Sequence, residues 1–422
     1  MVSLPLILTA LLCAMPVAAM TVGGGSALFY AMALLCSLRC LSRPGGWRET
    51  LHSLRSYRIV IVAMSVPLCA IALSQYAHGL FHGPSLERGL RISIGLPVIL
   101  GALLSIETAR LRHAFWGIAA ALWTSTATVL WLSLPAWNRP DTPQYNAVGY
   151  ANLMMLWLFI TLYGMHWPLL KRPRLEQCFK LLTVACGFAG VILTQTRTAW
   201  MAIPLFLFLG MWLFGHMQRP WRALGVLAAS LAILVALGST SQALRTRVAQ
   251  GVHELQECHG AKATADTSVC IRLQLWRASV EMIEAEPLVG LGTPARFIPE
   301  LQARVARGVV SPFVAQDFGE PHNDMLQMLS SYGLLGGLGL ALLYCVPAGF
   351  FLRRLAAPNP APLRAAATMG AALALGFAVF GLTELMFRSM QNVSLYVTLL
   401  AWFLALCRSE SEAQGPAQSG RR

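Results

Sequence analysis

The residues with the clearest chemical potential are Pro321 to Asp324, where a long polar stretch meets an apolar one that continues to Leu352. We expect His322 to stand at the amino-terminal end of a helix, where the helix dipole disfavours an imidazolium ion and helps to keep the ring neutral. A neutral imidazole can take a proton from an incoming hydroxyl group. Asn323 either caps the helix or orients the ring, and it is also a candidate for substrate binding. The alternative interpretation of the segment is a helix cap without chemistry.

Two arginines could supply positive charge beside such a base. Arg197 lies in the polar segment Thr194 to Thr198 between two apolar stretches, and Arg272 opens an amphipathic part of the long polar stretch. A guanidinium presents a planar fork to phosphate oxygens and stays charged at any relevant pH. Both arginines are therefore candidates for anion binding. The alternatives are a short turn whose arginine extends to the membrane interface, and a solvated helix charge.

Other polar residues are weaker candidates. Arg88 and Arg91 either extend a basic entrance to the site or anchor the chain at the membrane interface, and Asn146 is a candidate for contact with a glycan. Glu384 and Arg388 are expected to pair with each other. The sequence has no HExxH or DxD motif, and we expect no dense external cluster of histidines and carboxylates. It therefore predicts neither a metal nor a cofactor.

The elements that position these residues are apolar helices. The chain is 56% hydrophobic and 12% charged, against a charged fraction of about 25% in soluble domains. A bilayer core requires about 20 apolar residues per helix. The sequence predicts an all-α, polytopic membrane protein with about twelve spans. The expected spans are residues 4–20, 22–38, 59–77, 90–106, 114–134, 148–170, 178–196, 198–216, 223–238, 325–352, 365–383 and 390–407.

Basic residues set the expected orientation. No Lys or Arg precedes the first apolar stretch, so we expect a retained first span instead of a cleaved signal peptide. Lys and Arg gather in the short loops on one side of the predicted bundle, which places both termini in the cytoplasm. The net charge of +14 then reflects this topology and contact with anionic membrane lipids, and it is not a sign of nucleic-acid binding.

The predicted organisation is a membrane domain with one large external loop. Residues 1–238 hold nine spans, 239–322 form the loop or lid, 323–408 hold three spans, and 409–422 form a disordered cytoplasmic tail. Periodicity in the loop predicts a helix over 271–285 and a second over 299–308. Cys258 and Cys270 both lie in the exported loop, where two thiols tend to pair, so we expect a disulfide; two free thiols are the alternative.

Taken together, these motifs resemble those of the bacterial O-antigen ligase and polymerase superfamily of lipid-linked glycan transferases. The resemblance rests on the segment around Arg197, an Arg-x-x-x-Trp helix start at Arg272, and the His322-Asn-Asp motif. Tyr332-Gly333 and Leu335-Gly336-Gly337 follow the last motif, and the layout of spans and loop also matches. One departure is the Thr after Arg197, where many relatives have Gly.

The resemblance implies a GT-C-like glycosyltransferase fold in the inner membrane with its active site facing the periplasm. It implies an undecaprenyl-pyrophosphate-linked O-antigen as donor, an essential His322, and Arg197 and Arg272 as pyrophosphate-binding residues. The compact length and single large loop favour a ligase that transfers O-antigen to lipid A-core oligosaccharide. A polymerase and a protein O-oligosaccharyltransferase are the alternatives within the superfamily.

Displacement of a lipid pyrophosphate builds negative charge on the leaving group, which two guanidinium groups can stabilise without a metal. A single displacement inverts the anomeric centre, so the sequence predicts metal-independent, inverting transfer. A function of another class is a transporter or flippase for lipid-linked sugars, which would carry charges at mid-span and inverted repeats. The polar residues here gather instead at the predicted external edge.

Overall fold

The computed structural model of the chain describes most of its length. The described residues are 3–23, 25–43, 45–134, 140, 142, 144–196, 198–215, 221–222, 224–225, 227–229, 232, 258 and 264–408. The predicted tail at 409–422 and most of the predicted span at 223–238 lie outside them.

The described part of the chain is all-helical, without strands, as the sequence predicts. The helices preceding the long polar stretch are α1 Leu4–Thr21, α2 Gly25–Leu41, α3 Gly46–Leu54, α4 Arg58–Ala77, α5 Gly83–Ser93, α6 Gly95–Leu103, α7 Thr108–Arg112, α8 Phe115–Ser133, α9 Ala147–Tyr163, α10 Pro173–Leu193 and α11 Ile203–Phe214. Those that follow are α14 Ser268–Ala285, α15 Phe297–Ala303, α16 Pro312–Asp317, α17 Asp324–Ala356, α18 Ala361–Phe380 and α19 Met390–Leu406. Short 3₁₀ turns cover Arg55–Tyr57, Gly164–His166, Thr198–Ala202 and Pro294–Arg296.

Six described segments are long and apolar enough to cross a membrane: α1, α3 with α4, α7 with α8, α10, α17 and α18. The apolar helices α2, α9, the segment Thr198–Phe214 and α19 are shorter. The predicted span at 90–106 is divided by a turn at Ile94, between α5 and α6. Pro97, in the first turn of α6, has no amide hydrogen to bond back across that turn. Twelve spans remain a prediction.

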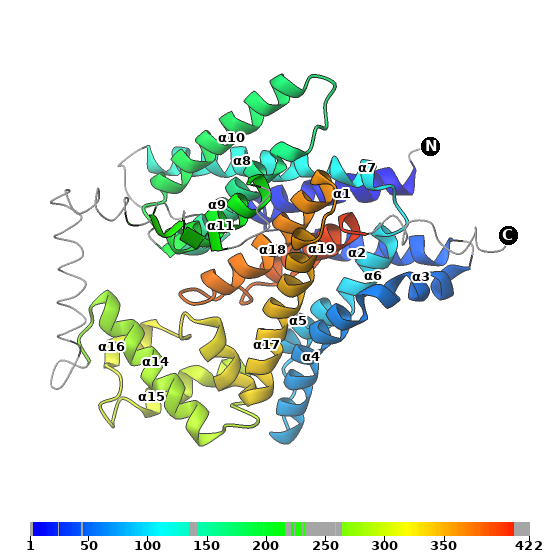
Figure 1. Cartoon of the computed structure of the whole chain (residues 1–422). Coiled ribbons are helices and arrows are strands. Elements are labelled where there is room, and N and C mark those ends of the chain that lie inside the picture. The colour runs from blue at the N-terminus through cyan, green and yellow to red at the C-terminus, as the bar shows by residue number, and fades with distance from the viewer. Residues whose placement is uncertain are drawn as a thin grey trace.

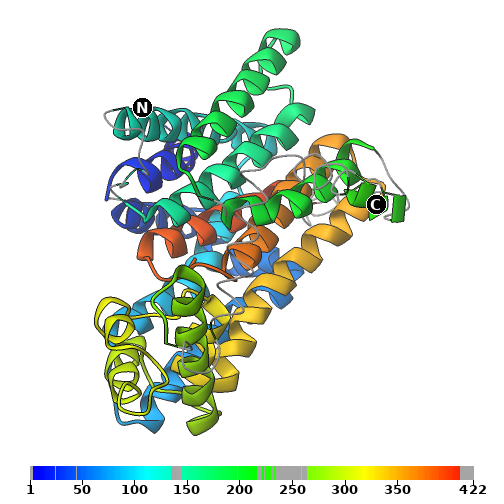
Figure 2. The same cartoon turned by 90° about the vertical axis from the view of Figure 1, so that its left-hand side faces the viewer.

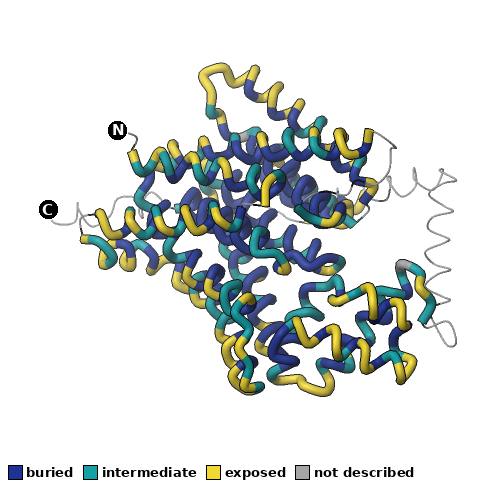
Figure 3. The backbone as a smooth tube through the Cα atoms, turned by 180° about the vertical axis from the view of Figure 1, so that it is seen from behind, coloured by how far each residue is buried: buried dark blue, intermediate teal, exposed yellow. Residues whose placement is uncertain are grey.

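The long helix α17 joins the bundle of apolar helices to the layer formed by residues 264–320. It lies against α4 along one side and against α18 along another (Figure 1). Small residues permit the close contact with α18, because a methyl group at Gly370 would collide with the ring of Phe351. Helices α9, α18 and α19 are almost wholly buried at the centre of the bundle, as the burial colouring shows (Figure 3).

Residues 264–320, here called the lid, form a separate helical layer beside the ends of α4 and α17 (Figure 2). The lid has its own apolar core, which includes Leu275, Met282, Phe297, Leu301 and Val314. The predicted helix at 271–285 is confirmed as α14, three residues longer at its start. The predicted helix at 299–308 is wrong in its extent: α15 ends at Ala303, and α16 was not predicted.

A buried arginine stands at the end of α15. Arg304 is only 5% exposed, and its guanidinium bonds Glu281 of α14 at 3.2 Å and Glu300 at 2.7 Å. The chain then turns, and Gly308 adopts a left-handed conformation with φ of 69°. The pair with Glu281 holds the end of α15 against α14 in a way that local sequence periodicity does not encode.

The expected disulfide between Cys258 and Cys270 is confirmed. Cys270 lies in the first turn of α14, where Thr267 caps the helix by accepting a hydrogen bond from its amide. The disulfide therefore ties residue 258 to the start of the helix that carries Arg272.

The lid is fastened to the membrane helices at a break in α17. Gly333 has φ of 66° and ψ of −160° inside the helix, which frees the preceding carbonyls from their helical partners. The amide of Leu291 donates to the Ser330 carbonyl at 2.8 Å, so lid backbone completes the broken helix. Side chains at Gly333 or Gly290 would collide with the opposite backbone. This docking accounts for the glycine of the Tyr332-Gly333 motif.

Candidate active site

His322 stands at the junction between the lid and α17. Its backbone is left-handed, with φ of 49°, a conformation that is uncommon for residues other than glycine. Asn323 caps α17, because its Oδ1 accepts a hydrogen bond from the Leu326 amide at 3.0 Å. Its Nδ2 donates to the Leu382 carbonyl at 3.1 Å, which links the helix start to the turn between α18 and α19. Asn323 therefore performs the capping, and the His322 ring does not.

Two glutamates flank the imidazole. His322 Nδ1 lies 3.8 Å from Glu320 Oε1 and 3.8 Å from Glu384 Oε1. The expectation that no external cluster of histidine and carboxylates exists is therefore wrong. Glu384 follows α18, far along the chain, and only folding brings it to His322. The Phe318 ring closes another side of the imidazole, with an edge contact at 6.0 Å between ring centroids.

The expected pair between Glu384 and Arg388 is also wrong. Arg388 Nη1 bonds Glu320 Oε1 at 2.6 Å instead. Glu384 accepts a hydrogen bond from Asn146 Nδ2 at 3.0 Å. Beside His322, Glu320 thus pairs with the charged Arg388, and Glu384 bonds the neutral amide of Asn146.

The two glutamates have opposite pKa shifts. Burial would raise the pKa of Glu384, but hydrogen bonding and the charge of His322, together with the Asn146 amide, outweigh it and lower the pKa. Burial raises the pKa of Glu320, an effect that Arg388 and His322 only partly offset and that the neighbouring Glu384 reinforces. At neutral pH Glu384 is consequently the firmer negative charge beside the imidazole.

Asp324 holds the turn that carries Glu384 in place beside His322. Its carboxylate is buried and accepts hydrogen bonds from the Tyr344 hydroxyl at 2.8 Å and the Met386 amide at 3.1 Å. Its own amide donates to the Gly381 carbonyl at 2.8 Å. Because these groups lie in the turn between α18 and α19, Asp324 holds that turn, and with it Glu384, against the start of α17.

Glu320, His322 and Glu384 could together hold a metal ion, since one ligand atom from each lies within 4.8 Å of the others. The guanidinium of Arg388 already bonds Glu320. A cation placed between the three groups would be repelled by it. The arrangement is thus better suited to an imidazole oriented by carboxylates than to a divalent ion.

The predicted arginines have different surroundings. Arg91 is 5% exposed and bonds Glu87, Ser26 and Ser394, while its guanidinium lies 4.5 Å from the Tyr30 ring centroid. These contacts favour a role in bundle packing over contact with a substrate.

Arg88 donates from Nη2 to the Arg388 carbonyl at 2.9 Å, which brings it to the edge of the His322 cluster. Its Nε is buried and has no hydrogen-bond partner in the described part of the chain. Of the two arginines of α5, Arg88 is therefore the one with hydrogen-bonding capacity left for an anion.

Arg272 lies in the first part of α14. Trp276, one helical turn later, donates from its indole nitrogen to the carbonyl of Pro321 at 3.0 Å. Residues four apart share one face of a helix, so Arg272 shares the face that contacts the segment with His322. Among the described residues it has no ion-pair partner.

Arg197 itself lies outside the described residues. Its neighbour Thr196 is buried and donates to the Ala147 carbonyl at 3.2 Å. Ala147 follows Asn146, the partner of Glu384. The described part of this polar segment thus contacts the same end of α9 that supports the His322 cluster.

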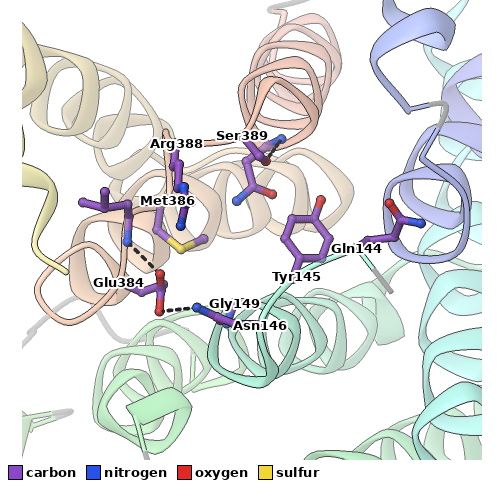
Figure 4. Close-up of a pocket in the computed structure, with 10 residues that line it drawn as sticks. Gln144, Tyr145, Asn146, Gly149, Glu384, Met386, Arg388 and Ser389 are labelled. Carbon is purple, nitrogen blue, oxygen red and sulfur yellow. Dashed lines mark hydrogen bonds between the residues drawn. The ribbon is translucent and has the colours of Figure 1, made fainter. Parts of the chain in front are cut away.

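Two cavities adjoin the cluster. One, of ≈ 280 Å³, is lined by Asn146, Glu384 and Arg388 among others (Figure 4). The second, of ≈ 150 Å³, is lined by Arg88, Glu320 and Arg388 among others. Arg388 belongs to both linings, and each glutamate borders one cavity.

A comparison with protein families found a match over part of the chain. Residues 182–341 match the family model described as O-antigen ligase. Over these residues the chain is similar to O-antigen ligases. The matched O-antigen ligase segment contains the motifs at Thr194–Ala199, Arg272–Trp276 and His322–Asp324 and ends before Glu384. Beside this match, six described segments are long and apolar enough to cross a membrane. A search of curated proteins gave no match.

Sequence reasoning did not assign a site role to Glu320 or Glu384, and it paired Arg388 with the wrong glutamate. A signal for Glu384 existed, since a carboxylate in a short turn between two apolar helices is costly unless it has partners. The sequence alone could not identify those partners as His322 and Asn146.

Proposed function

We propose that this protein is an O-antigen ligase, a glycosyltransferase that transfers O-antigen from undecaprenyl pyrophosphate to lipid A-core oligosaccharide. The reaction takes place at the periplasmic face of the inner membrane, with both termini in the cytoplasm. The observation that carries the proposal is His322 between two carboxylates, beside two cavities and within the matched family segment.

In this mechanism His322 is the general base. Its Nδ1 faces Glu320 and Glu384, so Nε2 is the nitrogen that accepts the proton of the acceptor hydroxyl. The hydroxyl oxygen forms a bond to the anomeric carbon of the donor sugar as the bond from that carbon to the pyrophosphate oxygen breaks. The negative charge of Glu384 stabilises the imidazolium that results. A single displacement inverts the anomeric centre.

Guanidinium groups stabilise the leaving pyrophosphate in this mechanism. Arg272 lies one helical turn before Trp276, which bonds the residue before the base, and Arg88 has a buried Nε available beside the second cavity. Arg197 completes the set as a prediction from the sequence. Charge-assisted hydrogen bonds from planar guanidinium groups suit phosphate oxygens, so the reaction proceeds without a metal ion.

The test uses purified full-length protein, lipid-linked O-antigen and lipopolysaccharide that lacks O-antigen, without an energised membrane. We expect transfer by the wild type, its retention in EDTA, and its loss in His322→Ala. His113→Ala is the matched control, because His113 is an exposed histidine at the start of α8, far along the chain from the site. Loss of transfer in EDTA would contradict the metal-free mechanism.

The same reaction separates the alternatives. Growth of polymer on the carrier lipid would identify a polymerase, and glycosylation of an added protein acceptor would identify a protein O-oligosaccharyltransferase. Movement of the lipid-linked sugar across a vesicle membrane without transfer would identify a flippase. Any of these results, with transfer to lipopolysaccharide absent, overturns the ligase assignment.

A further inference from the structure

The cavity of ≈ 280 Å³ beside Glu384 has a lining that the proposed mechanism does not explain. Gln144, Tyr145 and Asn146 line it from the segment that leads into α9, while Ser389 and Asn392 line it from the start of α19. Figure 4 shows these segments facing each other across the cavity, with Glu384 at one edge. Amide and hydroxyl groups dominate, with one carboxylate and one guanidinium.

Two buried polar atoms of this lining have no protein partner. The Tyr145 hydroxyl and Asn392 Oδ1 are inaccessible to solvent and accept or donate no hydrogen bond within the described part of the chain. Asn392 is only 3% exposed. Because a buried polar group without a partner is destabilising by about 1–3 kcal/mol, such groups in a cavity indicate a ligand that supplies the missing bonds. Burial raises the pKa of Tyr145, so its phenol is a neutral donor.

The chemistry of the lining selects the ligand class. Neutral amide and hydroxyl groups complement the hydroxyls of a sugar, which both donate and accept. A phosphate is less suited, because Glu384 borders the cavity and Arg388, the guanidinium in the lining, bonds Glu320. The volume is near the lower limit of small-molecule sites, about 300 Å³, which suits one sugar ring and not a long chain.

We infer that this cavity binds the terminal sugar of the acceptor through its hydroxyl groups, an assignment that rests on the proposed ligase function. Glu384 borders the cavity and lies 3.8 Å from His322 Nδ1. A sugar held by Tyr145 and Asn392 therefore lies against the carboxylate that pairs with the base. The first sugar of the donor has the same chemistry and is the competing occupant.

Tyrosine variants provide a matched test. Tyr145→Phe removes only the unpartnered hydroxyl that faces the cavity. Tyr150→Phe removes a buried hydroxyl from the adjacent ring, which does not line the cavity. Asn392→Leu removes the second unpartnered group at similar volume. Thermal unfolding of each purified variant confirms that it folds, and Tyr145→Phe carries the test if Asn392→Leu does not.

The measurement is the KM for lipopolysaccharide lacking O-antigen at saturating donor, and the KM for lipid-linked O-antigen at saturating acceptor. We expect Tyr145→Phe and Asn392→Leu each to raise the acceptor KM about five-fold, the effect of one lost neutral hydrogen bond, with the donor KM and Tyr150→Phe unchanged. A rise in the donor KM alone assigns the cavity to the donor sugar and overturns the acceptor assignment. Unchanged KM values in both cavity variants overturn the sugar site.

A binding experiment separates this inference from the proposed function. Soluble, delipidated core oligosaccharide is titrated calorimetrically into wild type, Tyr145→Phe and Tyr150→Phe. If the wild type ligates nothing but binds the oligosaccharide, and only Tyr145→Phe weakens binding, the sugar site stands and the ligase assignment fails. If the wild type ligates but Tyr145→Phe binds core oligosaccharide as well as the wild type does, the sugar site fails alone.

Discussion

Gly333→Ala tests how the lid is held over His322. The backbone of Gly333, at φ 66° and ψ −160°, lies in a region that is essentially restricted to glycine. A methyl group there would also collide with the Leu288 backbone. The substitution must therefore either strain the chain or release the lid backbone from α17.

The cost follows from the contacts at the break. Backbone strain of this kind amounts to about 1–3 kcal/mol. Three hydrogen bonds join the segments, from the amides of Leu291 and Gly292 to α17 and from Leu334 to the lid at 2.8–2.9 Å, each contributing about 1 kcal/mol. These bonds hold the lid on α17 in both proteins, whereas release relieves the strain only in the variant, so Gly333→Ala shifts the release equilibrium by about 1–3 kcal/mol. That shift corresponds to amide exchange about 5- to 150-fold faster at Leu291.

The assay is hydrogen exchange of the purified protein, followed at residues 286–292. Gly349→Ala, in the same helix, is the control, because no atom lies within 4 Å of the position of its methyl group. It should stabilise α17 by about 0.5–1 kcal/mol. Gly290→Ala disturbs the same junction from the lid side. The double variant with Gly333→Ala should therefore accelerate exchange far less than the sum of the two single effects, expressed as free energies. Unchanged exchange in Gly333→Ala, or equal acceleration in Gly349→Ala, would refute the docking mechanism.

Further predictions concern the charges and the disulfide. The fold lowers the pKa of Glu384. Its carboxylate therefore stabilises the protein above the ordinary glutamate pKa of about 4.3 and ceases to do so as the pH falls through the lower folded value. Glu384→Gln should lower the Tm at pH 7, and the difference in Tm from wild type should shrink in acid. The pKa of Glu320 is raised, so the fold favours its protonated form and Glu320→Gln should not lower the Tm at pH 7. A fall in Tm equal to that of Glu384→Gln would contradict the opposite pKa shifts of the two glutamates. Serine at both Cys258 and Cys270 should cost about 3 kcal/mol of lid stability, measured by protease cleavage of the lid, with reductant having no further effect on the variant. Arg272→Ala should reduce kcat/KM about 10- to 150-fold through loss of a charged hydrogen bond, with Arg272→Lys intermediate; activity as high as wild type in the alanine variant would exclude a pyrophosphate role.

Most helix positions could be predicted from the sequence, because a long apolar stretch has few alternatives in a membrane. The predicted spans 59–77 and 114–134 correspond to α4 and α8 within one residue at each end. Helix ends that depend on tertiary contacts could not be predicted as well from the sequence. The break at Ile94 precedes a single proline in the first turn of α6, and α15 ends beside Arg304, which pairs with Glu281 of another helix.

The candidate site was predictable only where its residues are neighbours in sequence. His322 was identified from its position between a polar loop and an apolar helix, and Asn323 was correctly considered as a cap. Glu384 was missed because its role exists only through contacts made by folding, to His322 and Asn146. The unpartnered groups of Tyr145 and Asn392 have no sequence signature at all.

The His-Asn-Asp motif acquires a physical explanation from these contacts. Asn323 caps α17 and bonds the turn that follows α18, while Asp324 accepts bonds from the same turn and from Tyr344. Both residues therefore fix the distance between His322 and Glu384. Since the family match ends at residue 341, the carboxylate that they position lies beyond the matched segment. The site is thus assembled from a motif and a distant turn, and the two residues after His322 are the connection between them.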